Sequence, residues 1–300
     1  TNSAEQLIIG GQDNTPCTGW YGGIIDEVRI SATDRSAQWI ATEYNSTNAP
    51  NLFVSNGTKE APCGGGGALT INPCEWSWRK KLTVNKTMVS GSQNYFPVLV
   101  NFSSDSDLAS NAQDSGNDIV FTSSDMTTRL PHEIENFTKS NGGLVAWVNV
   151  PNINSSANAE IYLYFGNSTK PSQQNATGVW SNGYAAVWHL ADTSGQILDS
   201  TSNTNHGTGG GNPTLGFPGK IGKAISFDGI DDRVTVPYNS NLNGTGSITL
   251  DAWVKTSLKS ANVVSKISTD GNLYGYIMAV GGNTGKSDGK IDYWVDNLSI

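Results

Sequence analysis

The sequence predicts an all-β protein built from antiparallel β-sandwich domains. Short segments with apolar residues at alternate positions recur along the chain, as in 223–227 and 233–236, and Gly, Asn and Asp separate them. A period of two is the pattern of a strand with one buried face. The composition agrees, because the chain has few charged residues and many Gly, Asn, Ser and Thr. Several such strands at spacings of roughly 8–12 residues are typical of a sandwich.

The composition also limits the classes of function. A length of 300 residues allows two domains, since a domain has roughly 150 residues. A net charge of −8 argues against a nucleic-acid partner, because phosphate binding relies on clustered Lys and Arg. No stretch approaches the ~20 apolar residues that span a bilayer, and no signal peptide opens the chain. We therefore expect either a mature protein or an excised piece.

The strands at 223–227 and 233–236 give the clearest hairpin signal. They flank the sequence Asp-Gly-Ile-Asp-Asp, in which Gly229 supplies the positive φ angle that a tight turn needs. We interpret the acidic side chains of this segment as turn residues, with cation binding as the alternative. They are Asp228, Asp231 and Asp232.

The stretches 219–236 and 248–254 closely resemble the opening half of a laminin-G-like, concanavalin A-like jelly-roll domain. Residues 21–31, Tyr-Gly-Gly-Ile-Ile-Asp-Glu-Val-Arg-Ile-Ser, and the tail at 35–45 look like the closing strands of the same family. The resemblance implies a jelly roll of two curved antiparallel sheets. It also implies a protein that is usually extracellular and often binds glycans or other proteins.

Residues 1–44 would thus end one jelly roll, and residues 184–300 would begin another. A half jelly roll exposes its core and an unpaired strand edge, so each half needs a partner. The chain can be a segment of a longer multidomain protein, which is the arrangement we favour. The two halves can also join within one chain, around an inserted domain. Finally, 1–44 of one copy can complete 184–300 of the next, and this contact would not close and would build a fibre.

Residues 5–11 and 21–31 predict strands within the first segment. Thr33 or Asp34 would then cap a short helix that runs through Tyr44, because apolar residues recur there at helical spacing. Residues 45–75 predict a linker, since they are rich in Gly and Asn.

Cys63 and Cys74 bracket a run of four glycines in this linker. A disulfide between them is expected in a secreted protein, and two free thiols are the alternative. Zinc is disfavoured, because there is no C-x-x-C pair and the three histidines are scattered. Cys17 is left over and would pair with residues absent from this chain or with a neighbouring chain.

Residues 76–183 predict a second sandwich. Together with 178–180 and 187–190, its segments closely resemble an uncharacterised domain family that commonly precedes laminin-G-like domains in secreted bacterial and archaeal proteins. The resemblance covers 76–190 and implies architecture and location, but the family has no established chemistry to transfer. The expected strands are 76–84, 95–102, 117–122, 130–136, 144–150 and 160–167.

Two segments together suggest a structural calcium site. Ca²⁺ takes several oxygen ligands from carboxylates, amides and carbonyls. In related concanavalin A-like domains, the acidic residue of the closing strand often meets the opening segment at such a site, and Asp26 and Asp199 match those positions. Asn203 and Asn205 would supply further oxygens. The alternative is an Asx turn at 199–205 beside an outward Asp26.

Glu133 and Glu135 are the candidates for catalysis. They lie two residues apart on an expected strand, so both carboxylates face one side with Cα atoms roughly 6.5–7 Å apart. Glycoside hydrolysis uses paired carboxylates at about 5–10 Å. Concanavalin A-like glycosidases usually carry an E-x-D-x-x-E run, whereas this segment reads H-E-I-E and lies in the other domain. We interpret the pair as solvent-facing strand residues and predict no enzymatic activity.

The nine tryptophans are the other resource for binding, because aromatic faces supply large and rigid contact areas for ligands such as sugar rings. Four lie within apolar strands and are predicted to be core residues, namely Trp78, Trp147, Trp188 and Trp253. Better candidates for surface platforms are Trp20, Trp39 and Trp294.

Ten N-x-S/T triplets are acceptor signals for N-glycosylation. A chain this rich in Asn, Ser and Thr would contain roughly six by chance, so the excess is mild. It is consistent with a secreted glycoprotein. The acceptor residues are Asn45, Asn56, Asn85, Asn101, Asn136, Asn154, Asn167, Asn175, Asn243 and Asn297.

Together these observations predict a non-enzymatic, secreted or cell-surface protein of adhesion or surface structure. Its sandwiches would bind glycans or neighbouring copies, with Ca²⁺ as a structural ion. One alternative is a self-assembling extracellular filament or surface-layer subunit, completed by strand exchange between copies. The other is a glycan-active enzyme that uses Glu133 and Glu135. No phosphate loop and no Ser-His-Asp or Cys-His signature favours another chemistry.

Overall fold

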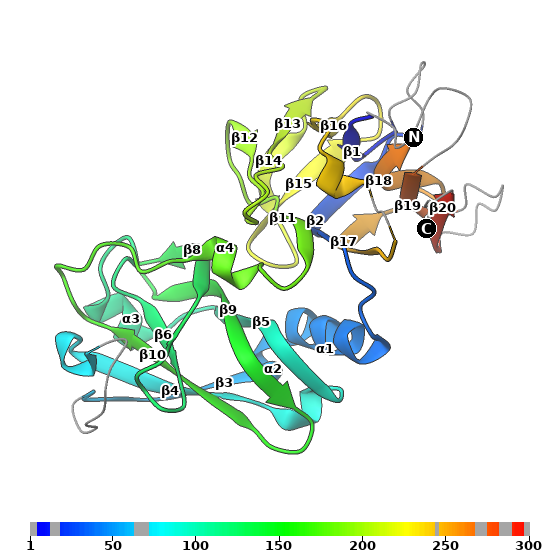
Figure 1. Cartoon of the computed structure of the whole chain (residues 1–300). Helices are drawn as coiled ribbons and strands as arrows, with labels where there is room; N and C mark the ends of the chain where they lie inside the picture. The colour runs from blue at the N-terminus through cyan, green and yellow to red at the C-terminus, as the bar shows by residue number, and fades with distance from the viewer. Residues whose placement is uncertain are drawn as a thin grey trace. The chain divides into compact units, whose positions relative to one another are not determined.

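A computed structural model describes residues 5–12, 19–62, 72–243, 246–267, 275–281 and 290–296. The chain folds into two compact units. Unit 1 combines residues 1–35 with 183–300, and unit 2 is the continuous segment 36–182. Both consist mainly of antiparallel strands (Figure 1), so the predicted all-β sandwich fold is confirmed.

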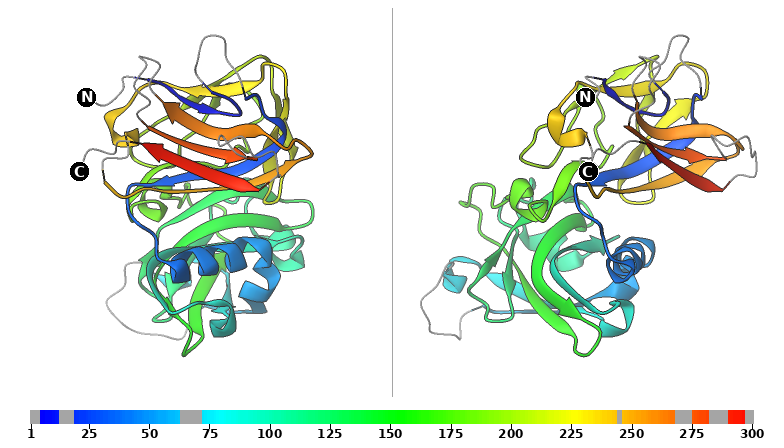
Figure 2. Two further views of the ribbon diagram at one scale, coloured as in Figure 1. Left: turned by 90° about the vertical axis from the view of Figure 1, so that its right-hand side faces the viewer. Right: turned by 45° about the vertical axis from the view of Figure 1, so that its right-hand side comes forward.

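Unit 1 contains two antiparallel sheets, which Figure 2 shows from two sides. The larger sheet has the order β12-β13-β16-β1-β18-β19-β20, and the smaller has the order β11-β2-β15-β14 with β17 paired to β2. Strands of the larger sheet are β1 (Leu7–Ile9), β12 (Gln196–Ile197), β13 (Gly207–Gly210), β16 (Arg233–Val236), β18 (Ala261–Ile267), β19 (Gly275–Val280) and β20 (Ile291–Asp296). Those of the smaller sheet are β2 (Gly22–Ser31), β11 (Tyr184–Trp188), β14 (Thr214–Pro218), β15 (Lys223–Asp228) and β17 (Thr249–Thr256).

The core of unit 1 joins side chains of both sheets in one apolar cluster. Ile25, Val28 and Ile30 of β2 belong to it, together with Val264 of β18 and Tyr276 of β19. All five side chains are almost fully buried. Burial of apolar side chains is the main favourable term in folding. Because this cluster contains side chains from both sheets, the two sheets stabilise each other.

The strands before residue 36 pair with strands of the later segment in the same chain. β1 lies between β16 and β18. β2 has β17 on one edge, and β15 and β11 on the other. The two halves therefore join within one chain, and unit 2 is inserted between them in the sequence. This is the second of the three arrangements considered above. Exchange of these strands between copies stays a prediction.

Unit 2 has a five-stranded sheet in the order β3-β4-β10-β6-β7 and a three-stranded sheet in the order β5-β9-β8. Its elements are α1 (Ala37–Asn48), α2 (Pro50–Phe53), β3 (Val54–Glu60), η1 (Pro73–Glu75), β4 (Trp78–Val84), η2 (Lys86–Met88), β5 (Ser92–Phe102), α3 (Ser106–Asn111), β6 (Val120–Ser123), β7 (Arg129–Leu130), β8 (His132–Thr138), β9 (Gly143–Asn154), β10 (Ala159–Phe165) and α4 (Ala176–Val179). One further 3-10 turn, η3 (Ser240–Leu242), belongs to unit 1.

The first domain boundary differs from the prediction. Helix α1 is capped by Ser36, whose Oγ accepts the Trp39 N–H at 3.1 Å, rather than by Thr33 or Asp34. The helix belongs to unit 2, where Trp39 packs on Phe96 with ring centroids 4.8 Å apart. The boundary therefore falls at residue 35 instead of 44. The buried face of α1 is mostly polar, and Trp39, Thr42 and Ser46 contact other residues of unit 2 through it, whereas Ile40 and Tyr44 are exposed.

The expected linker at 45–75 is wrong for the part that the structure describes. Residues up to 48 continue α1, Pro50 begins α2, and β3 follows and pairs with β4. Only Val54 of β3 is buried, so no alternation marked this strand. The backbone ladder holds it instead. Residues 63–71 lie outside the described residues.

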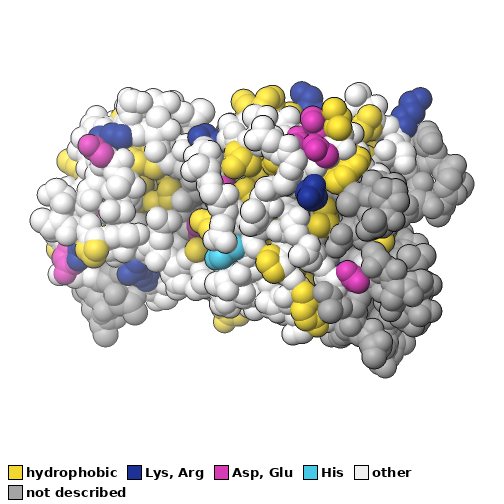
Figure 3. All heavy atoms as spheres, turned by 90° about the horizontal axis from the view of Figure 1, so that it is seen from above, with side chains coloured by type: hydrophobic (Ala, Val, Ile, Leu, Met, Phe, Trp, Pro, Cys, Tyr) yellow, Lys and Arg dark blue, Asp and Glu magenta, His cyan; other side chains and the backbone are white. Residues whose placement is uncertain are grey.

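The described residues include no helix that is long and apolar enough to cross a membrane. On the face drawn in Figure 3, charged side chains occur singly or in small groups. This scattered distribution agrees with the low content of charged residues.

Candidate functional site

Strand β2 carries a β-bulge at Glu27 and Val28, directly after Asp26. In the ladder with β17, Glu27 and Val28 stand opposite the single residue Ala252. Glu27 adopts a left-handed conformation with a φ of 54°, which is uncommon for a residue with a side chain. On the other edge, the partner of β2 changes here from β15 to β11. Bulges re-aim side chains and are frequent beside functional sites.

The bulge decides which side chains of β2 leave the core. Ile25, Val28 and Ile30 all belong to the core cluster, although a regular strand that buries Ile25 would also bury position 27. The extra residue therefore keeps both Asp26 and Glu27 out of the apolar core. The two carboxylates therefore point away from the apolar cluster and bind polar groups instead.

A pocket of about 350 Å³ opens beside the bulge and is lined by residues of unit 1. Asp26 and Trp253 are cross-strand partners, and Ile24 pairs with Lys255 two positions along the same strands. All four side chains therefore share one face of the β2–β17 pair. Residues 218–220, at the end of β14, complete the lining. The register of two strands thus builds most of the pocket.

The carboxylate of Asp26 is buried in the wall of this pocket. Its Oδ2 accepts the backbone N–H groups of Lys220 and Ile221, at 2.7 and 2.9 Å, while Oδ1 is buried without a hydrogen-bond partner. Burial raises the pKa of Asp26 to about 8, and the charge of Glu27 adds to the rise, against the two N–H groups. Asp26 is therefore mostly protonated at neutral pH.

Lys220 and Trp253 supply the other chemistry of the pocket. The ammonium nitrogen of Lys220 lies 4.9 Å from the centroid of the Trp253 ring, a cation–π contact. Trp253 is half-buried, and Lys220 is exposed. An aromatic ring, an ammonium donor and a carboxyl group therefore line one cavity, which is a combination suited to a ligand with both apolar faces and hydroxyl groups.

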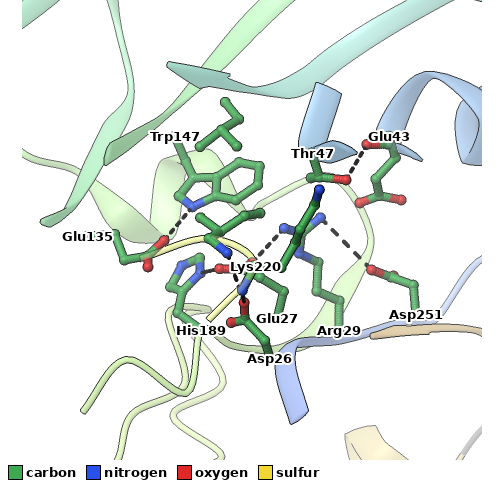
Figure 4. A network of polar contacts seen from close by, with 12 residues as sticks. Asp26, Glu27, Arg29, Glu43, Thr47, Glu135, Trp147, His189, Lys220 and Asp251 are labelled. Carbon is green, nitrogen blue, oxygen red and sulfur yellow. Dashed lines mark hydrogen bonds and ion pairs between the residues drawn. The ribbon is translucent and has the colours of Figure 1, made fainter. Parts of the chain in front are cut away.

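A buried ionic network lies next to Asp26, and Figure 4 shows its members in unit 1. Glu27 binds Arg29 at 2.6 Å and the Nδ1 atom of His189 at 2.8 Å. Arg29 also lies 3.9 Å from Asp251 across the strand pair. Burial alone would raise the pKa of Glu27, but the charges and hydrogen bonds of His189 and Arg29 outweigh it, so this pKa is lowered. The network holds a charged carboxylate beside the protonated Asp26.

The four residues predicted to bind calcium are only partly brought together. Asp199 lies in the loop with Asn203 and Asn205, and both amide groups donate to the Ala185 carbonyl. The Asp199 oxygens accept four donors, namely the N–H groups of residues 187, 201 and 205 and the Thr201 hydroxyl. Asp26 shares none of these partners. Calcium at these residues stays a prediction, and the ion would have to displace donors at Asp199.

The turn after β15 holds the other group of acidic residues, of which the first two are exposed and the last is buried. Asp228, Asp231 and Asp232 place carboxylate oxygens within 4.8 Å of one another. Asp228 Oδ1 accepts the Ile230 N–H at 2.8 Å, and Asp232 Oδ2 accepts the Asp228 N–H at 2.8 Å. These bonds fit the interpretation as turn residues.

Glu133 and Glu135 lie on β8 and bind two tryptophans. Glu133 Oε2 accepts the Trp180 N–H at 2.7 Å, and Glu135 Oε2 accepts the Trp147 N–H at 3.1 Å. The two indole rings pack with centroids 5.4 Å apart. The ladder with β9 shifts register at Glu135, and both side chains are half-buried rather than solvent-facing. These contacts fit a structural role, while the catalytic alternative stays a prediction.

Cys74 is disulfide-bonded. It follows Pro73 in the short turn η1, just before β4. Cys63 and Cys17 both lie outside the described residues. The pairing of Cys63 with Cys74 therefore stays a prediction.

Several of the ten glycosylation triplets form turns through their own side chains. At Asn85, Asn154 and Asn167, the Oδ1 atom accepts both the N–H and the hydroxyl of the residue two positions later. At Asn175 it accepts the Thr177 hydroxyl. These are Asx-type turns, in which the Asn side chain stabilises the backbone of the turn. The Asn residues of these triplets therefore have a structural role.

The remaining triplets vary, and occupancy by glycans stays a prediction. In four of them the Asn amide donates to another group, namely at Asn45, Asn56, Asn136 and Asn243. Asn101 is half-buried on β5, and Asn297 lies outside the described residues.

The tryptophan assignments are confirmed only in part. Trp147 and Trp188 are fully buried, as predicted. Trp78 and Trp253, predicted to be core residues, are half-buried. Trp39, predicted to be a surface platform, is buried because its helix packs on unit 2. Burial of a strand residue depends on which face it occupies. Leu250, Ala252 and Val254 of β17 pack in or against the core, so regular alternation places Trp253 on the other face.

Comparison with known proteins gives one family. A family model described as a domain of unknown function, DUF2341, matches residues 115–205. A search of curated proteins and a search of solved structures found no match. The resemblance to an uncharacterised domain family is thus supported over 115–205, and the match crosses from unit 2 into β11 and the Asp199 loop of unit 1. The laminin-G-like resemblance stays a prediction.

Sequence reasoning missed the roles of His189, Arg29 and Trp253. A signal was present for the first two. His189 directly follows the apolar run 184–188, and Arg29 lies between Val28 and Ile30. A charged residue next to buried strand positions has to be paired. The partner of each, Glu27, could not be identified from spacing alone.

Proposed function

We propose that unit 1 binds glycans in the pocket formed by Asp26, Trp253, Lys220 and Lys255, as part of a secreted or cell-surface protein of adhesion or surface structure. The observation that carries the proposal is the cross-strand pairing of Asp26 with Trp253 in one pocket. An aromatic ring can stack on the apolar face of a sugar. Beside it, Oδ1 of Asp26 is buried without a hydrogen-bond partner, and a sugar hydroxyl would pair with it once the pocket wall shifts to admit it.

Size and polarity of the pocket support this ligand class. A volume of about 350 Å³ lies in the range of small-ligand sites, roughly 300–1,000 Å³. The ammonium groups of Lys220 and Lys255 can donate to hydroxyl oxygens at its rim. A buried polar atom without a partner costs free energy, and a ligand hydroxyl that pairs with Asp26 would remove that cost.

Replacing Trp253 with Ala is expected to weaken glycan binding about tenfold or more, because one stacking contact of this kind is worth about 1 kcal/mol beyond the area it buries. A glycan array probed with the full chain would select a ligand. Isothermal titration calorimetry would then measure its affinity for the wild type and the variant.

Trp78→Ala provides a matched control for this measurement. Trp78 is also a half-buried strand tryptophan with a lysine over its ring, since Lys59 lies 4.3 Å from its centroid. It belongs to unit 2 and does not line the pocket. Unchanged affinity in Trp78→Ala with loss in Trp253→Ala supports the proposal. Equal affinity of wild type and Trp253→Ala, or binding to no glycan, contradicts it.

A further inference from the structure

A buried lysine of unit 2 contacts two carboxylates, and one of these also binds an asparagine. Lys80 of β4 is only 4 % exposed. Its Nζ lies 2.5 Å from Asp105 Oδ2 and 2.9 Å from Asp107 Oδ2. Asn56 of β3 donates through Nδ2 to the same Asp105 oxygen, at 2.7 Å. An amine and a carboxamide therefore meet on one carboxylate oxygen.

The surrounding backbone holds these groups in place. Asp105 is the N-cap of α3, and its Oδ1 accepts the N–H groups of Asp107 and Leu108. This fixes the carboxyl group and leaves Oδ2 for the side chains of Lys80 and Asn56. β3 and β4 are neighbours in the sheet, with a register irregularity between Asn56 and Lys59. Lys80 Nζ and Asn56 Nδ2 thus share one acceptor oxygen, and holding two reacting groups near each other lowers the entropic barrier to reaction.

We propose that Lys80 and Asn56 form an isopeptide bond, with Asp105 as the group that transfers protons. Asp105 Oδ2 takes a proton from Nζ, and the neutral amine attacks Cγ of Asn56. A C–N bond forms, the bond from Cγ to Nδ2 breaks, and the two protons lost by Nζ pass through Asp105 to the departing nitrogen. The products are one amide and one ammonium ion, so atoms and charge balance without an oxidant or cofactor.

Asn56 is a better electrophile here than Asp105. A carboxylate carries a negative charge that repels a nucleophile, and Asp105 is ion-paired with Lys80. The carboxamide of Asn56 is neutral. A positioned carboxylate within hydrogen-bond distance of both the attacking and the leaving nitrogen meets the geometric requirement for general acid–base catalysis.

The bond would fasten a strand that has few other contacts. β3 lies at the edge of its five-stranded sheet, and most of its side chains are exposed. Edge strands are the part of a sheet most open to fraying and to pairing with other chains. A covalent link to β4 would prevent fraying, independently of whether unit 1 binds glycans.

The mass of the denatured, disulfide-reduced full chain tests the proposal. The wild type is expected to be lighter than calculated from its sequence by one ammonia, about 17 Da. A tryptic digest should contain a branched peptide that joins the fragment with Asn56 to the fragment with Lys80. Lys80→Met and Asp105→Asn should both restore the calculated mass, with circular dichroism to check that they fold.

Lys81→Met is the matched control, because Lys81 is the next residue of β4 and pairs with Glu160 on the surface instead. It should keep the mass deficit and the branched peptide. A wild type at its calculated mass overturns the proposal, whatever the variants do. Loss of water instead of ammonia, which would join Lys80 to Asp105, also overturns it. So does loss of ammonia without a branched peptide, because a succinimide at Asn56-Gly57 gives that result.

Discussion

Replacing Asp26 with Asn is expected to stabilise unit 1 strongly at pH 8 and to change its stability little at pH 4. Burial raises the pKa of the folded Asp26 to about 8, whereas an unfolded aspartate titrates near about 3.9. Between these two values the folded chain holds a proton that the unfolded chain has released. The stability of wild-type unit 1 therefore falls as the pH rises from about 4 to about 8.

The expected size follows from the width of this window. About four pH units at about 1.4 kcal/mol each give a loss on the order of 5 kcal/mol. Asn has no proton to release, and its amide oxygen can accept the N–H groups of Lys220 and Ile221 as Oδ2 does now. The charged groups facing Asp26, Glu27 and His189, are unchanged in the variant. Its stability should therefore fall much less than that of the wild type across this window, and the remaining fall comes from Asp192 and Asp232, whose pKa values burial also raises.

Urea-dependent hydrogen exchange with mass spectrometry can measure this effect for each unit in the full chain. Peptides from β2 and β17 report on unit 1, and peptides from β9 report on unit 2. Asp231→Asn is the control, because it removes an exposed carboxylate of the same unit. It should keep the wild-type pH dependence. If Asp26→Asn loses as much stability as the wild type between pH 4 and 8, the folded Asp26 is already ionised and the prediction is wrong.

The second large effect of pH on stability is expected at His132 of unit 2. Here stability falls as the pH falls, whereas at Asp26 it falls as the pH rises. Burial lowers the pKa of His132 to about 4, compared with about 6.5 in an unfolded chain. The ring lies close to the backbone of Leu130 and Ile119 and packs against Phe121 with centroids 5.2 Å apart. Between these two pKa values, from about pH 6.5 down to about pH 4, the unfolded chain binds a proton that the folded chain does not bind. Unit 2 should therefore lose about 3 kcal/mol in this range.

His132→Phe is expected to remove most of this acid sensitivity, because Phe keeps an aromatic ring and has no charge to acquire. The measurement is the same exchange experiment at pH 7, 5 and 4, read from the β9 peptides. Peptides of unit 1 give an internal control, since their pH dependence should match that of the wild type. An equally steep loss of stability in His132→Phe would mean that another group of unit 2 takes up the proton.

The sandwich class could be predicted from the sequence because alternation is a local property. Segments such as 223–227 and 233–236 proved to be β15 and β16, within one residue at each end. The missed elements lack that signal. β3 buries only Val54, so its place in the sheet depends on the ladder with β4. The extent of α1 depends on its packing against unit 2, which local spacing cannot encode.

The candidate pocket was harder to predict, because it depends on a one-residue irregularity. The apolar residues of β2 recur with a gap of two positions between Ile25 and Val28 but of one between Val28 and Ile30. That change of phase is the sequence signal of a bulge. Once it is recognised, Asp26 and Glu27 are expected to leave the core. The pairing of Asp26 with Trp253, over two hundred positions later in the chain, still requires the fold.

The position of β2 has a consequence for the order in which the chain acquires its structure during synthesis. Unit 2 is continuous, so its strands can pair as soon as they leave the ribosome. β2 emerges before all of them, yet its partner β17 comes only after residue 248. Because such distant pairings form slowly, we expect the first segment to wait unpaired beside an already folded insertion. Unit 1 would then close last, once the strands after residue 183 have been made.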